Sequence, residues 1–212
     1  MIKSIIAISM VFSHIIFPSK SSAEARNCYF SDIPSFIKGK TLPTGRAADL
    51  SFSDYRTYNP KQAALLLRCA ENLYRNAVFK NFDEETHKRL DRTMAHAWED
   101  HNSGPSSTID GYITLGGSSK SGADIALGTF VIGPDKNLVA VGLNLNNLEV
   151  VDEDHFSNGV FSGFVFIYDY YSEHQNKIKM QTMENILNSI QDSFGDIYHY
   201  KNVYFLRSTI NL

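Results

Sequence analysis

The sequence predicts an α+β domain in which an N-terminal helical hairpin packs on a mainly antiparallel sheet, with a further helix before the last strand. Between Asn59 and His101, apolar residues recur at helical spacing in two consecutive stretches. After Ser106 the chain becomes glycine-rich, with short β-favouring runs separated by turn signals. Hairpin signals in place of alternating βα units favour α+β over a parallel α/β fold.

The first 25 residues have the pattern of a signal peptide. Lys3 supplies a basic start, an apolar run covers residues 5–17, and Ala23-Glu24-Ala25 provides small residues for cleavage. The run is shorter than the roughly 20 apolar residues that a membrane-spanning helix needs. We therefore expect residues 1–25 to be removed and residues 26–212 to form a single periplasmic or secreted domain.

Charge argues against nucleic acid as a partner. Removing Lys3, Lys20 and Glu24 from the 20 basic and 23 acidic residues leaves 18 and 22, a formal charge of −4. Phosphate neutralisation by basic side chains supplies most non-specific affinity for nucleic acid. A mildly acidic chain without a basic tract does not match that pattern.

The only two cysteines are Cys28 and Cys69. In an exported protein an even pair predicts a disulfide, and the absence of a C-x-x-C motif argues against a redox role. The bridge would tether residues 26–58, where scattered prolines and glycines predict loops and turns rather than regular structure.

The first helix is predicted to begin at Asn59-Pro60, with Asn59 as the cap, and to extend to about Val78. Asp83 and the acidic residues after it introduce the second helix, whose buried face includes Trp98. A third helix is expected from Ser172 to Phe194.

Strands are predicted from β-favouring runs and the turns between them. Residues 133–137, Gly-Pro-Asp-Lys-Asn, form a hairpin loop between two of these strands. The long run from Val160 is apolar on both faces, which is typical of a central strand. The predicted strands are Tyr112–Leu115, Ile125–Ile132, Leu138–Leu145, Leu148–Val151, Val160–Tyr171 and Asn202–Leu206.

A glycine-rich stretch from Gly116 to Gly122 superficially resembles a phosphate-binding loop. A P-loop requires Lys and then Ser or Thr directly after its second glycine, whereas Ala123 and Asp124 follow Gly122. The stretch also lacks the G-x-S-x-G and S-x-x-K patterns of serine hydrolases. It is interpreted as a flexible surface connection.

The best candidates for chemistry are His96 and Asp100, one helical turn apart, together with Asp124. Two helix-borne ligands do not complete a metal site, H-E-x-x-H is absent, and a histidine near a helix C-terminus is also favoured by the helix dipole. The sequence therefore predicts neither a metal nor a cofactor, and it favours a non-enzymatic role.

The candidates for partner binding are Lys120 in the glycine-rich stretch and the acidic turn Asp152-Glu153-Asp154. The acidic turn does not have the EF-hand spacing, because Phe156 and Ser157 occupy positions where a calcium ligand and a glycine are needed.

These observations favour an exported protein that acts by binding another protein. In overall plan the chain resembles the small exported immunity proteins with which bacteria neutralise toxins in their own periplasm, which implies an immunity-type inhibitor. The resemblance is architectural and no motif carries it. An exported hydrolase with a dispersed site and a secreted effector or virulence factor are the alternatives.

Overall fold

The computed structural model describes most of the chain from Cys28 to Thr209. The described residues are 28–38, 51–80, 82–99, 108–119, 126–150, 159–168, 180–193, 198–200 and 202–209. The predicted signal peptide, residues 1–25, lies outside them.

Five helices and seven strands make up the described fold. In chain order they are α2 (Ile33–Lys38), α3 (Phe52–Tyr58), α4 (Pro60–Arg75), α5 (Glu84–His96), β1 (Thr108–Ile109), β2 (Tyr112–Ser118), β3 (Leu127–Ile132), β4 (Leu138–Val150), β5 (Gly159–Tyr168), α7 (Met180–Ser193), β6 (Tyr198–Tyr200) and β7 (Val203–Arg207).

The strands form one mixed sheet in the order β1-β2-β3-β4-β5-β6, with β7 also paired to β5. Strands β1 to β5 are antiparallel neighbours, whereas β6 and β7 run parallel to β5. A parallel return requires a crossover, and α7 lies in the connection from β5 to β6. The predicted α+β fold with a mainly antiparallel sheet and a helix before the last strands is confirmed.

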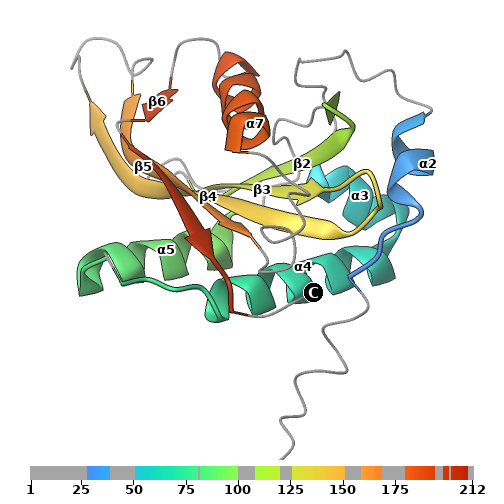
Figure 1. Ribbon diagram of the computed structural model, residues 1–212, viewed down its shortest axis with the longest axis horizontal. Coiled ribbons are helices and arrows are strands. Elements are labelled where there is room, and N and C mark those ends of the chain that lie inside the picture. Colours follow the sequence, from blue (N-terminus) through green and yellow to red (C-terminus); the bar gives the residue numbers. More distant parts are fainter. Residues whose placement is uncertain are drawn as a thin grey trace, which may run out of the picture.

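The sheet is the middle of three layers (Figure 1). Helices α4 and α5 lie along one face and α7 lies on the other. On the α4/α5 face, cross-strand neighbours such as Leu115, Phe130, Val141 and Ile167 form a continuous buried row. A second cluster on the opposite face joins strand residues to Met183, Ile186 and Leu187 of α7.

The N-terminal segment contains more regular structure than its composition predicts. Helices α2 and α3 fall within residues 26–58, which we expected to form loops and turns. Helix α3 begins at a capping box in which Ser51 and Asp54 exchange hydrogen bonds, and it buries Phe52 and Tyr55. The expectation failed because these helices are too short to show a helical period and depend on burial of single aromatic side chains.

The main helices begin where the sequence indicates. The Asn59 side chain accepts a hydrogen bond from the Gln62 amide and Pro60 occupies the first helical position of α4. Asp83 caps α5 through the Thr86 amide. Helix α4 ends at Arg75, about one turn before the predicted end. Helix α7 is described from Met180, and the predicted start at Ser172 lies outside the described residues.

The predicted disulfide between Cys28 and Cys69 is present. Both half-cystines are almost fully buried and join the segment before α2 to the middle of α4. That segment also extends the β3–β4 hairpin, because the Phe30 amide donates to the Lys136 carbonyl and the Leu138 amide donates to the Cys28 carbonyl. In the described part of the chain, no helix combines the length and apolarity needed to cross a membrane.

Two sequence interpretations in the sheet are wrong. Gly116, Gly117 and Ser118 are not a flexible surface connection, because they belong to β2 and both glycines are buried. Residues 148–150 are not a separate strand, because β4 continues through them after an irregularity between Leu145 and Leu148.

The glycines of β2 and β3 make room for Trp98. Gly117 and Gly128 lie directly opposite each other in the sheet. A Cβ atom on Gly128 would lie 2.5 Å from Trp98 Cη2, and one on Gly117 would lie 2.5 Å from the Ala97 carbonyl oxygen. The indole stacks on Phe130, with 3.9 Å between ring centroids, and its Nε1 donates to the Met94 carbonyl. As predicted, Trp98 faces the sheet.

The substitution Gly128→Ala tests this contact. The added methyl group overlaps the indole, so we expect the free energy of unfolding to fall by about 1–3 kcal/mol, the usual cost of overpacking. The penalty should shrink in a Trp98→Phe background, which removes the overlapping ring atoms. Urea unfolding of the four proteins, followed by circular dichroism, measures the coupling. An equal penalty in both backgrounds would show that Trp98 is not the obstacle.

The disulfide should stabilise the fold by reducing the conformational entropy of the unfolded chain. For a loop closed across the separation of 41 residues, the chain-entropy relation gives about 4 kcal/mol, and measured values usually fall between 2 and 4. We expect the Cys28→Ala/Cys69→Ala variant to lose about that much free energy of unfolding. Reduction of the wild-type protein should produce a comparable loss, and a change below about 1 kcal/mol would contradict the tethering role.

Candidate functional site

Two neighbouring β-turns form one end of the sheet. Asp110 and Gly111 connect β1 to β2 with φ of 51° and 81°, the left-handed pair that suits an Asp-Gly hairpin turn. The loop between β3 and β4 lies beside this turn, because a Cβ on Gly111 would be 3.5 Å from Pro134 Cγ. The two hairpin ends therefore form one continuous surface.

A pocket of about 230 Å³ lies at these turns. Its apolar walls come from Tyr112, Pro134 and Val139, and Gly133 and Asp135 complete the lining. Small-molecule sites usually occupy about 300–1,000 Å³. The pocket is smaller than that range.

Tyr112 is the polar group at the pocket wall. The residue is 7% exposed and lines the pocket together with Asp135. Burial raises the pKa of Tyr112, and the negative charges of Asp135 and Asp110 raise it further. The phenol therefore stays neutral at physiological pH, close to two carboxylates.

Contacts with α7 and with the N-terminal segment hold this end of the sheet in place. The Asp110 carboxylate accepts from Thr182 Oγ1 and Asn185 Nδ2, each at 3.5 Å. On the other side of the loop, Tyr29 pairs with Asn137. Because Cys28 and Phe30 face the α4/α5 layer, alternation along the strand directs Tyr29 to the same side as the pocket.

We use the term hairpin-end surface for Tyr29, Asp110, Tyr112, Pro134 and Asp135. Tyr29 is 48% exposed, and Asp110, Pro134 and Asp135 are exposed around the pocket. Tyrosine is enriched at protein interfaces, where it offers a large apolar ring and a hydrogen-bonding tip. The hairpin-end surface therefore combines an exposed aromatic ring with a small pocket.

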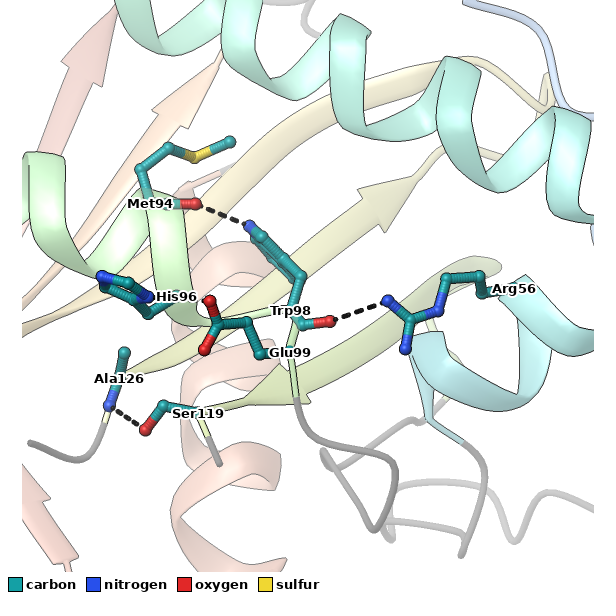
Figure 2. Close-up of polar contacts among 7 residues, drawn as sticks. All are labelled: Arg56, Met94, His96, Trp98, Glu99, Ser119 and Ala126. Atoms are coloured by element: carbon teal, nitrogen blue, oxygen red, sulfur yellow. Dashed lines mark hydrogen bonds and ion pairs between the residues drawn. The ribbon is translucent and has the colours of Figure 1, made fainter. Parts of the chain in front are cut away.

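The sequence-predicted histidine lies elsewhere, at the C-terminal end of α5 (Figure 2). His96 Nδ1 is 2.9 Å from Glu99 Oε1, and both side chains are about half exposed. Nearby in the chain, the Trp98 carbonyl accepts from Arg56, while Ser119 Oγ accepts from the Ala126 amide. An exposed ion pair such as His96–Glu99 contributes little to stability. Of its two residues, His96 is the one that the sequence predicted as a candidate for chemistry.

The other predicted site residues lie outside the described residues. These are Asp100 and Asp124 among the candidates for chemistry, and Lys120, Asp152, Glu153 and Asp154 among the candidates for partner binding. Among the described side chains, no group of three or more His, Cys, Asp or Glu residues is arranged to hold a metal ion.

Sequence reasoning identified the loop at 133–137 but not the pocket beside it. The signals that were available are Asp110-Gly111, a strong hairpin dipeptide directly before Tyr112, and the Gly-Pro-Asp turn at residues 133–135. Each signal marks a turn. Their proximity follows from the pairing of β2 with β3, which the sequence does not specify.

Two other tyrosines donate hydrogen bonds to carboxylates on the opposite side of the sheet. Tyr55 donates to Asp32 at 2.9 Å and Tyr74 donates to Asp91 at 2.7 Å. Burial raises the pKa of both phenols, and the hydrogen bonds to the carboxylates raise it further. These pairs connect helices, Tyr55 joining α3 to the turn before α2 and Tyr74 joining α4 to α5.

No known family, curated protein or solved structure matches the chain.

The raised phenol pKa values predict a loss of stability in alkali. Above about pH 10 an unfolded tyrosine loses its proton, whereas Tyr55 and Tyr74 keep theirs in the folded protein. The unfolded state then binds fewer protons, so stability is complete below about pH 10 and falls as the pH rises. In urea titrations between about pH 9 and 11, Tyr74→Phe should lose less stability than the wild type. An unchanged slope would contradict this assignment.

Proposed function

We propose that the protein acts by binding another protein through its hairpin-end surface, as an exported immunity-type inhibitor. The observation that carries the proposal is the pocket at the two turns, with the exposed ring of Tyr29 beside it. Loops held on a rigid scaffold are where proteins most often carry recognition.

The construction of the surface supports this role. Both turns belong to hairpins of the central sheet, and the N-terminal segment that carries Tyr29 is fixed by two backbone hydrogen bonds and by the disulfide. A binding surface that is already ordered loses less conformational entropy when the partner docks. Such preorganisation suits an inhibitor that must hold its target tightly.

The proposed location outside the cytosol is supported by the disulfide. Bridges of this kind form and persist in oxidising compartments such as the periplasm. The signal-peptide pattern in residues 1–25 supports the same location.

Site-specific cross-linking in the native cells tests the proposal. Tyr29→p-benzoylphenylalanine and Pro134→p-benzoylphenylalanine place a photoreactive ring on the hairpin-end surface. Lys88→p-benzoylphenylalanine is the control, because Lys88 is exposed on α5, on the opposite face of the sheet. We expect one discrete adduct from the first two variants and none from the control. No adduct, or the same adduct from all three, would contradict the assignment.

The identity and activity of the cross-linked protein test the immunity role. Purified wild-type protein should bind the identified partner, abolish its toxic activity at equimolar concentration and protect a deletion strain. If the cross-linked partner has no toxic activity, the proposed binding surface stands and the immunity role is contradicted.

A further inference from the structure

We infer that the open edge of β7, the red strand in Figure 1, binds an extended segment of another protein as an additional antiparallel strand. This segment begins with an acidic residue and then alternates apolar side chains. The inference is independent of the hairpin-end surface. Strand β7 lies beyond β5 at one margin of the sheet, whereas the two turns connect β1 to β2 and β3 to β4.

The first argument is the direction of the backbone groups in β7. The Asn202 carbonyl and the Ser208 amide both bond to β5. Because the direction alternates along a strand in a parallel pair, the amide and carbonyl groups of Val203 and Phe205 point away from β5. Within the described part of the chain, these groups have no hydrogen-bond partner. An added strand offers amides and carbonyls at the matching spacing.

The second argument is that this edge lacks the usual protection. Proteins guard edge strands by keeping them very short, by placing proline or inward-pointing charge in them, or by covering them. The opposite edge is guarded, because β1 has only two residues and Ser51 forms a bridge to Gly116 of β2. Strand β7 has five residues without proline, and its apolar and aromatic residues follow one another from Val203 to Leu206. Such an edge is a template for another strand.

The third argument fixes where the added strand begins. Residues 76–78 run antiparallel to residues 207–209 on the outer edge, and the Val78 amide donates to the Arg207 carbonyl. An added antiparallel strand therefore begins opposite Leu206 and runs towards β6. A second copy of β7 does not fit, because two copies paired in this way would each place residues 76–78 against the backbone of the other's β6 and β7.

The fourth argument is positive charge at this starting point. Lys80 lies between two contacts with β7. Before it in the chain, the Val78 amide donates to the Arg207 carbonyl. After it, the Phe82 ring lies 5.0 Å from the Tyr204 ring, measured between centroids. Lys80 and Arg207 are both exposed, and Lys80 makes no ion pair with a described residue. An acidic first residue is the complementary group.

Peptide titration followed by nuclear magnetic resonance tests the inference. In the probe acetyl-Asp-Val-Thr-Val-Thr-amide, the two valines come opposite Phe205 and Val203 when the aspartate lies opposite Leu206. We expect saturable shifts of the backbone amides of residues 203–207. N-methylation of both valines should weaken binding about tenfold, because their amides face β7 and two hydrogen bonds are lost. N-methylation of both threonines, whose amides face away, is the control and should leave the affinity unchanged.

Equal losses from the two methylated peptides would overturn strand pairing, and shifts confined to other regions would overturn the site.

The substitution Val203→Pro tests the edge from the side of the protein. The Val203 amide points away from β5, so proline removes a donor to the added strand while the pairing with β5 remains. We expect at least fivefold weaker binding of the probe. The control Val203→Thr keeps the amide and should bind like the wild type, and circular dichroism compares the folds of both variants. Wild-type affinity in a folded Val203→Pro protein would overturn the inference.

A charge exchange tests the acidic first residue without changing β7. Lys80→Glu should weaken the probe and strengthen a second peptide that begins with lysine. Lys61→Glu, at the other end of α4, is the control and should change neither affinity. Equal effects of the two substitutions would overturn the role of Lys80. Sedimentation measures the remaining occupant, because dimers of the wild type that Val203→Pro dissociates would show that a second copy takes this edge and would overturn the inference.

Discussion

The packing of Trp98 against two glycines is the contact on which the rest of the structure depends. Gly117 and Gly128 leave a slot across β2 and β3, and the indole fills it while stacking on Phe130. Phe52 of α3 meets both rings, at 5.8 Å from Trp98 and 5.0 Å from Phe130 between centroids. One side chain therefore fixes the end of α5, the short helix α3 and two central strands relative to one another.

This arrangement places the larger apolar cluster and the pocket in different parts of the fold. The α4/α5 face of the sheet carries the larger apolar cluster and the disulfide, and its helices are joined by the Tyr74–Asp91 bond. On the opposite face a single described helix, α7, covers a smaller cluster. The pocket lies at the edge of this second cluster, where Tyr112 and Val139 belong both to the core and to the lining. Substitutions at the rim of the pocket therefore leave the larger cluster on the α4/α5 face unchanged.

Most of the fold could be predicted from the sequence, because the long helices and strands have strong periodicity and caps. The Asn59-Pro60 start and the Cys28–Cys69 pair are local signals of this kind. The glycine-rich stretch was misinterpreted because the local sequence does not distinguish a glycine in a loop from a strand glycine that makes room for a neighbouring side chain. Only the position of Trp98, about 20 residues earlier in the chain, distinguishes the two cases. The pocket was missed for a related reason, since its walls come from two hairpins whose pairing is not a local property.

Tyr55 and Tyr74 show how this fold accommodates a buried phenol beside a carboxylate. Each hydroxyl donates a hydrogen bond to a carboxylate oxygen, at 2.9 Å from Tyr55 to Asp32 and at 2.7 Å from Tyr74 to Asp91. Burial and these hydrogen bonds raise the pKa of both phenols, so each remains a protonated donor at physiological pH. Because Tyr55 joins α3 to the turn before α2 and Tyr74 joins α4 to α5, the two bonds hold the helices of the α4/α5 side to one another.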